Sequence, residues 1–185
     1  MKSSVNAGFI LSGAMLINLP VFSQNTTNQS LNESKTTLKM ETNQTPSVNK
    51  ETVRSLYEDI LSTGKFELLK QIVSEEYEGP RGIKGPAGFA AAISPLRTAF
   101  PDIKWTVEDL IAEGDKVVVK WSWKGTNTSS FDGFPASSKT VMHHAINIFQ
   151  FEDHKIIKSW MQADRLGFYQ QIGVIAPDVT TAPVK

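Results

Sequence analysis

The spacing of apolar residues along the chain changes its period near residue 102. From residue 49 to residue 100, apolar side chains recur every three or four positions, which predicts helices over about 49–63, 66–75 and 86–100. Asn49 is a suitable N-cap for the first helix, Gly64 ends it, and Pro95 is expected to kink the third. Beyond residue 102, apolar and polar positions alternate, which predicts strands over 103–112, 116–126 and 140–151 and one further strand. The pattern therefore predicts an α+β fold, with three N-terminal helices packed on a curved sheet and a short C-terminal helix.

The segment from Ile146 to Gly173 predicts a β-hairpin followed by that short closing helix. The hairpin turn falls at residues 152–155, because Asp153 and His154 tolerate left-handed backbone better than most residues do. In the second strand of the hairpin, Trp160, Gln162 and Asp164 share one parity. We therefore expect an indole, an amide and a carboxylate to lie together beside a cavity.

The two ends of the chain differ in composition from its middle. Residues 1–23 combine Lys2 with a mostly apolar run, which is typical of a cleaved secretory signal peptide. The alternative is an uncleaved membrane anchor, but Asn6, Asn18 and Pro20 make the run a poor spanning helix. Residues 24–48 predict a disordered polar linker, residues 49–175 one folded domain and residues 176–185 a flexible tail. We expect export to a periplasm or to the exterior, without membrane association after cleavage.

Charge and cysteine content exclude several classes of function. The chain has 19 Lys and Arg residues and 19 Asp and Glu residues, so no basic surface for nucleic acid is expected. The absence of cysteine excludes disulfides, thiol catalysis and thiolate metal sites. The neighbours His143 and His144 face opposite sides of a strand and cannot hold one metal ion together without a bulge. We therefore expect no metal site.

Asp164 is the carboxylate with the strongest case for catalysis. It ends a strand on the same side as Trp160 and Gln162, where it could move a proton at a carbon next to a carbonyl group. It also directly precedes Arg165-Leu166-Gly167, where it would make a good N-cap. From spacing alone the cap is the favoured interpretation.

Other side chains are candidates for contact with a flat apolar ligand. The four tryptophans could form an aromatic wall, although for any single one a place in the core is the better interpretation. Tyr57 faces inward and could donate its hydroxyl to an oxyanion, or its tip could simply reach the rim. One of His143 and His144 should face inward, where it could line the cavity, although a hydrogen-bonded structural histidine is the more common outcome. The predicted ligand contacts are Tyr57, Trp105, Trp121, Trp123, His144, Asn147, Phe149, Trp160 and Gln162.

Several sequence blocks, taken in order, resemble a known family. The blocks are 99–103 (AFPDI), 107–117 (VEDLIAEGDKV), 121–126 (WSWKGT), 131–135 (FDGFP), 146–149 (INIF), 160–164 (WMQAD) and 170–173 (QQIG). From Glu51 to Val174 the chain is similar to the SnoaL-like polyketide cyclase (ester cyclase) family, within the nuclear transport factor 2-like superfamily. The resemblance implies a cone-shaped α+β barrel with a mixed or antiparallel sheet, and a homodimer paired through the exposed sheet face.

The resemblance also implies a reaction. Family cyclases close a polyketide ring by intramolecular aldol condensation without a cofactor, with an aspartate as general acid and base, and Asp164 occupies the matching position at a strand end. Sequence and resemblance together suggest an exported enzyme that acts on a small apolar carbonyl compound. Two alternatives stay open: a non-catalytic module that binds a small ligand or a partner protein, and a hydrolase or dehydratase that uses the same pocket.

Overall fold

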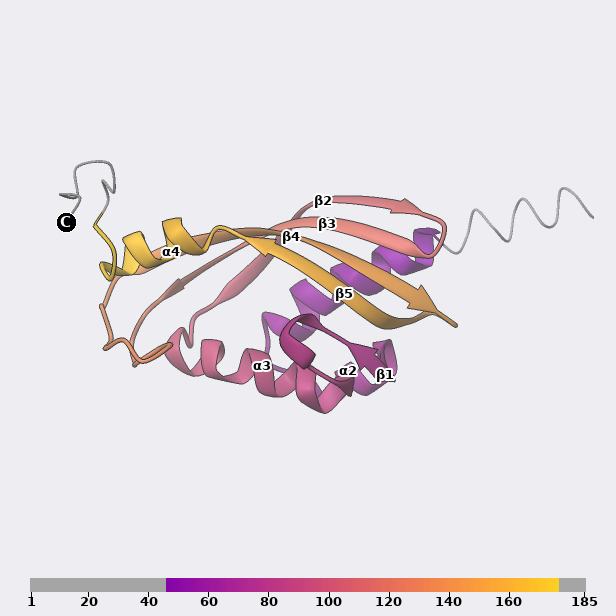
Figure 1. Ribbon diagram of the computed structural model, residues 1–185, viewed down its shortest axis with the longest axis horizontal. Coiled ribbons are helices and arrows are strands. Elements are labelled where there is room, and N and C mark those ends of the chain that lie inside the picture. Colours follow the sequence, from indigo (N-terminus) through magenta and orange to yellow (C-terminus); the bar gives the residue numbers. More distant parts are fainter. Residues whose placement is uncertain (1–45, 177–185) are drawn as a thin grey trace, which may run out of the picture. The chain divides into compact units, whose positions relative to one another are not determined.

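A computed structural model describes residues 46–176 of the protein. They form an α+β fold in which helices pack on one side of a mixed sheet and a short helix lies at the C-terminal end (Figure 1), which confirms the predicted fold class. The predicted signal peptide, and the predicted linker and tail apart from residues 46–48 and 176, lie outside the described residues. Within 46–176, no helix is both long enough and apolar enough to cross a bilayer.

The helical segments lie close to where periodicity predicts them. The first helix is already formed at residue 46, so Asn49 lies inside it and is not its cap. Pro95 lies within the third predicted helix, which continues through it to Ala99. The helical segments are residues 46–55, η1 (Leu56–Leu61, a π-helix), η2 (Phe66–Leu68), α2 (Leu69–Ile72), η3 (Pro80–Gly82), α3 (Gly85–Ala99) and α4 (Arg165–Ile172).

Five strands form one sheet in the order β1-β5-β4-β3-β2. The last four follow one another as an antiparallel meander, whereas β1 pairs with β5 in parallel. The strands are β1 (Val73–Glu78), β2 (Lys104–Glu113), β3 (Lys116–Thr126), β4 (Thr140–Glu152) and β5 (Lys155–Ala163).

Strand β1 is an element that periodicity does not predict, because its first residues continue the helical pattern that ends at Glu75. Val73 and Tyr77 are the buried residues of the strand, and their spacing of four suits a helix equally well. The strand forms because Val73 pairs with Ile156 of β5. The prediction of a helix through Glu75 is therefore wrong, and a contact distant in sequence is the reason.

The hairpin between β4 and β5 has the predicted turn but not the predicted sides. Asp153 and His154 both adopt positive φ, 46° and 61°, as a two-residue hairpin turn requires. In the resulting register, Ser159 pairs with Phe149 and Trp160 pairs with Ile148. Directly paired residues point to the same side of a sheet, so Ser159 faces inward with Phe149, whereas Trp160 lies outside and is 43% exposed. The predicted place of Trp160 beside the cavity is therefore wrong.

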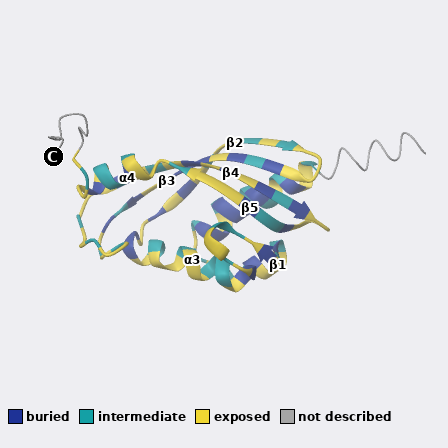
Figure 2. Cartoon of the chain, viewed as in Figure 1, coloured by how far each residue is buried: buried dark blue, intermediate teal, exposed yellow. Residues whose placement is uncertain are grey.

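Buried and exposed residues alternate along β3 and β4, as the colours of the strands in Figure 2 show, so the two faces of the sheet differ in burial. On the helix-facing side, alternate residues of β3 such as Val119 and Trp121 are buried, and Phe149 of β4 joins them. On the outer side, Lys120 and His144 are exposed. The core and any enclosed cavity therefore lie on the helix-facing side.

Candidate functional site

A cavity of about 400 Å³ lies on the helix-facing side of the sheet. Its lining comes from η1, β1, η3, α3, strands β2 to β5, α4 and the loop 127–139. Most lining side chains are aromatic or aliphatic, and the polar ones are a minority. A cavity of this size and character suits a small ligand with an apolar body and a few oxygen atoms.

Three of the four tryptophans stand on the cavity wall. Strand geometry places Trp121 and Trp123 of β3 on one side, and Trp105 of β2 joins them because it pairs with Trp123. None of the three is more than 5% exposed. The indole N–H of Trp121 donates to Asn147 Oδ1 at 2.8 Å, so its polar edge is satisfied inside the fold.

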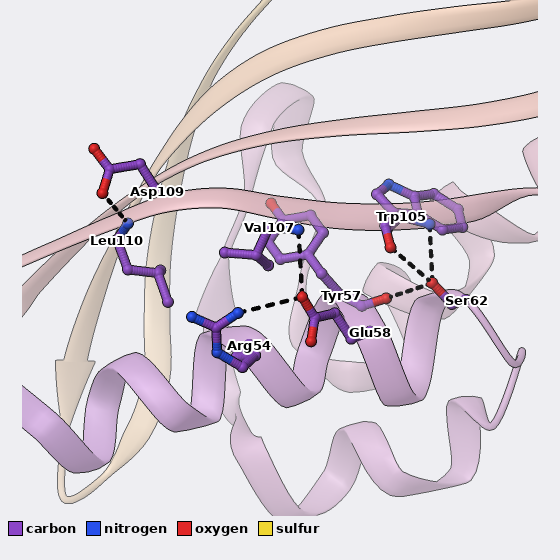
Figure 3. A network of polar contacts seen from close by, with 8 residues as sticks. All are labelled: Arg54, Tyr57, Glu58, Ser62, Trp105, Val107, Asp109 and Leu110. Carbon is purple, nitrogen blue, oxygen red and sulfur yellow. Dashed lines mark hydrogen bonds and ion pairs between the residues drawn. The ribbon is translucent and has the colours of Figure 1, made fainter.

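The π-helical turn that carries Tyr57 is fastened to the edge strand β2 (Figure 3). The backbone N–H of Trp105 donates to Ser62 Oγ at 2.9 Å, and that of Val107 donates to Glu58 Oε1 at 3.4 Å. Side chains thus satisfy two donors of an open sheet edge. Because the Ser62 hydroxyl also donates to the carbonyl oxygen of Tyr57 at 2.9 Å, the same hydrogen bonds hold Tyr57 and Trp105 against the cavity.

Tyr57 keeps its proton throughout the physiological range. Burial raises the pKa of Tyr57 well above its usual value, Tyr77 adds to the increase, and a hydrogen bond with Trp121 opposes it. Its ring lies 5.4 Å from the ring of Trp121, centroid to centroid. Tyr57 therefore offers a neutral O–H donor in an aromatic part of the wall.

His143 borders the cavity among aromatic rings. Its imidazole stacks on Trp123 at 5.6 Å between centroids and meets Phe168 edge-on at 5.3 Å. Within residues 46–176 its Nδ1 is buried without a hydrogen-bond partner. Burial lowers the pKa of His143 to about 4, and the Asp164 carboxylate only partly opposes that shift. The ring is therefore neutral at neutral pH, the form that accepts a proton.

Asp164 lies beside the histidines but does not border the cavity. Its backbone N–H donates to the carbonyl oxygen of His144 at 3.1 Å, and its charge acts on His143. Its Oδ1 accepts the N–H of Gly167 at 2.9 Å, so this exposed residue is the N-cap of α4. The cap that spacing predicts is confirmed, and a catalytic role for Asp164 stays a prediction.

Helix α4 and the loop 127–139 close one end of the cavity. Tyr169 Oη donates to Asp132 Oδ2 at 2.7 Å and accepts from Arg165 Nη2 at 2.8 Å. Phe131 and Phe168 pack edge to face at 5.9 Å. All five residues border the cavity, so this end combines an aromatic pair with a polar triad in which Asp132 and Arg165 are exposed and Tyr169 is half-buried.

The structure brings most of the predicted ligand contacts to one cavity. Those that border it are Tyr57, Trp105, Trp121, Trp123, Asn147 and Gln162, and their role in binding stays a prediction. Phe149 is instead buried in the core, 6.2 Å from the ring of Tyr57. His144 lies on the outer face, where its Nδ1 is 3.5 Å from Glu108 Oε1. The predicted positions of Phe149 and His144 at the cavity are therefore wrong, as is that of Trp160.

Several lining residues do not follow from the sequence alone. His143 pairs with the inward-facing Trp123, so the strand register, rather than the residue type, selects it over His144. Tyr77 and Ser159 come together because β1 adds to β5 in parallel. Arg81 arrives with η3, which lies between the predicted helices 66–75 and 86–100. A parity argument anchored on the buried tryptophans could have identified His143.

The described residues contain no group of three or more His, Cys, Asp or Glu side chains placed to hold a metal ion. The acidic residue at the cavity is Asp132, which is already engaged with Tyr169. The lining therefore offers hydrogen-bond donors and aromatic surface rather than a set of metal ligands.

A sequence model of the SnoaL-like polyketide cyclase family matches residues 51–172. No curated protein matches the chain. Among solved structures, TsrD from Streptomyces laurentii is 27% identical and superposes with a TM-score of 0.66, covering 70% of this chain and 97% of its own. A candidate polyketide cyclase from Bacillus cereus is 32% identical, with a TM-score of 0.60 and coverages of 70% and 83%.

The same fold also occurs in a protein for which a different activity is suggested. AclR from Streptomyces galilaeus, a candidate hydroxylase, is 18% identical with a TM-score of 0.61, and the alignment covers 76% of this chain and 87% of that one. At this identity the likeness concerns the fold alone. The architecture matches the cone-shaped fold of the nuclear transport factor 2-like superfamily.

Proposed function

Because the chain belongs to the SnoaL-like polyketide cyclase family, we propose that it is a cofactor-independent enzyme that moves a proton on a small apolar carbonyl compound. The family supports a role of the cyclase or isomerase type. The observation that carries the proposal is the neutral imidazole of His143, which borders an aromatic cavity beside the Asp164 carboxylate.

In the proposed reaction, His143 accepts a proton from the carbon next to a carbonyl group, and the electron pair of that C–H bond moves to the carbonyl oxygen, giving an enolate. The enolate carbon attacks a second carbonyl carbon of the same molecule, which forms a C–C bond and an alkoxide. The imidazolium then returns the proton to the alkoxide. Asp164 acts through His143, since its negative charge favours the imidazolium, and the Tyr57 hydroxyl donates to the enolate oxygen.

A non-catalytic ligand-binding module is the second candidate. The observation that favours it is that Asp164 is exposed and already serves as the cap of α4. Both candidates use the same cavity, and they differ in whether a bound carbonyl compound loses a proton. Exchange of hydrogen for deuterium at carbon therefore separates them.

The test uses 2-tetralone, a bicyclic ketone, incubated with the protein in D2O and followed by NMR. We expect the wild-type chain to accelerate exchange at the carbon atoms beside the carbonyl group, and His143→Gln to lose about 100-fold or more of that acceleration. The matched control is His144→Gln, which alters the neighbouring histidine on the outer face and should keep the wild-type rate. Binding of 2-tetralone without faster exchange would favour the binding module.

We also propose that the protein forms a homodimer through the outer face of the sheet. The strand registers align Ile111, Val118, Ile148 and Trp160 in one apolar row across four strands. Ile111 is 62% exposed and Trp160 43% exposed, so the row presents an apolar surface. Sedimentation equilibrium should show a dimer that Ile148→Lys dissociates, and a monomeric wild-type chain would contradict the proposal.

Export remains part of the proposal on the strength of residues 1–23, which lie outside the described residues. Expression of the full chain followed by fractionation and N-terminal sequencing would test it. We expect a product that starts after Ser23, outside the cytoplasm, in the periplasm or the medium. A product retained in the cytoplasm with Met1 or Lys2 at its start would contradict export.

A further inference from the structure

Two hydroxyl groups that are hydrogen-bonded to each other border the cavity. Tyr77 Oη and Ser159 Oγ lie 2.7 Å apart, and either oxygen can be the donor. Tyr77 is 2% exposed and Ser159 is 5% exposed. Both side chains contribute to the lining, so the pair is a polar feature in a mostly apolar wall.

The pair has one more O–H donor than its internal hydrogen bond requires. Two hydroxyl groups carry two O–H donors, and the bond between them consumes one. Neither side chain has another hydrogen-bond partner within residues 46–176. Burial raises the pKa of Tyr77, while its bond with Ser159 opposes the shift, so the phenol stays protonated. One O–H group is therefore left to donate, and buried donors rarely stay unpaired.

The surrounding backbone is shaped to accommodate this pair. A Cβ atom at Gly79 would lie 2.5 Å from the hydroxyl oxygen of Tyr77, so only glycine leaves room for the phenol. The parallel pairing of Glu78 with Lys158 brings β1 alongside Ser159. Ser159 also has an unusual neighbourhood for a polar side chain, since it pairs with Phe149 in the core. The pair is thus held by two elements that are distant in sequence.

The hydroxyl pair and His143 lie toward opposite ends of the cavity. Ser159 is level with Phe149 along β4, and His143 is six residues earlier on that strand. At roughly 3.3 Å per residue the backbone separation is about 20 Å, and the side chains of Tyr77, Ser159 and His143 all border the cavity between these positions. A ligand that spans this gap needs an extended apolar body.

We propose that the Tyr77–Ser159 pair is a second polar subsite, which donates a hydrogen bond to an oxygen atom of the ligand far from the atoms that His143 acts on. The ligand class is then an elongated apolar compound with an oxygen function at each end. This inference rests on the proposed function for the role of His143. The distal oxygen is a ketone or a carboxylate, and Arg81 favours the carboxylate because it borders the cavity with no acidic partner within 46–176.

The test compares probes that differ only at the far end. Quenching of tryptophan fluorescence in the full-length protein gives the Kd of 2-acetylnaphthalene, 2,6-diacetylnaphthalene and 6-acetyl-2-naphthoate. We expect a two-oxygen probe to bind about 3- to 10-fold more tightly than the one-oxygen probe, the effect of one added hydrogen bond. In Tyr77→Phe/Ser159→Ala this preference should fall below about 2-fold, while the Kd of 2-acetylnaphthalene stays unchanged.

Replacing both partners of a buried hydrogen bond by apolar groups of similar shape is close to neutral for stability, which a melting curve checks. Ser122→Ala removes a hydroxyl from the outer face and should keep the preference. If 6-acetyl-2-naphthoate binds more tightly than 2-acetylnaphthalene, and Arg81→Gln lowers only this preference, the distal group of the ligand is a carboxylate. If 2,6-diacetylnaphthalene is the preferred probe, the distal group is a ketone.

No preference in the wild-type protein, or one that survives in the double variant, would overturn the subsite. These readouts are binding constants and require no turnover. Failure of the subsite therefore leaves the deuterium exchange at His143 intact, and failure of that exchange leaves the probe preference intact. The two proposals are accordingly refuted by different measurements.

Discussion

The two faces of β4 place two imidazole side chains, those of His143 and His144, in opposite environments. His143 points to the helix-facing side, where it stacks on Trp123 and burial lowers its pKa to about 4. His144, the next residue, points outward and lies beside Glu108 in solvent. The comparison shows that reactivity here depends on the side of the strand rather than on the type of residue.

The inner face should tolerate truncation poorly. Phe100 is fully buried and its ring contacts Trp123, Phe131 and Phe168. Phe100→Ala should lower the free energy of unfolding by about 3–5 kcal/mol, because it removes a large side chain and leaves a cavity. On the outer face, Met142→Ala, outside the apolar row of the proposed dimer, should cost less than about 0.5 kcal/mol. Urea titrations of both variants check this, and equal losses would remove the contrast.

The buried imidazole should make stability depend on pH. Since the pKa of His143 is lower in the folded state than in the unfolded chain, its contribution is complete above about pH 6.5 and is lost as pH falls toward 4. After allowance for partial exposure, the loss should be about 1–2 kcal/mol. His143→Gln should flatten this part of the profile, and His144→Gln should not.

Carboxyl groups are expected to affect stability in a lower pH range than His143 does. The carboxyl groups of Asp102, Glu108 and Asp115 all have a pKa below the usual value, chiefly because of hydrogen bonds. Their contributions are therefore lost mainly below about pH 4. The difference between the wild type and His143→Gln from pH 7.5 to 4.5 isolates the imidazole, and parallel curves would contradict its burial as a neutral group.

The helix cap next to the histidines should have a smaller effect. Asp164→Ala removes the acceptor for the Gly167 N–H and should cost about 1 kcal/mol, whereas Asp164→Asn keeps a capping oxygen and most of the stability. Gly167→Ala should resemble Asp164→Ala, because the added methyl group would overlap the carboxylate. Thermal melting of the three variants checks this. A large loss in Asp164→Asn would show that its charge, not its cap, matters for stability.

The smallest effect should come from the outer-face ion pairs. Glu108 lies 2.9 Å from Lys120 and 3.5 Å from His144, and both partners are at least half exposed. Exposed pairs contribute about 0–1 kcal/mol, so Glu108→Gln should change stability by less than about 1 kcal/mol. Added salt should shrink even that difference, as urea titration in 0.5 M NaCl would show. A loss comparable with that of Phe100→Ala would erase the distinction between the faces.

Local pattern was sufficient for most of the architecture. The change from a period of three to four residues to strict alternation predicted the helices and strands β2 to β5, and Asp153 and His154 predicted the turn. It was insufficient for β1, whose buried residues suit a helix as well as a strand. It was also insufficient for Trp160, because alternation divides a strand into two sets without saying which set faces inward.

Sequence alone determined the α+β class, the single sheet with its hairpin turn, the cap at Asp164 and the membership of a family, because each of these depends on neighbours within a few residues or on ordered blocks of sequence. Only the tertiary structure decided that His143 rather than His144 meets the cavity, and that Tyr77 meets Ser159. Those outcomes depend on strand register and on a parallel pairing between distant segments. The free energy of such contacts comes from surfaces buried between segments, which no local pattern contains.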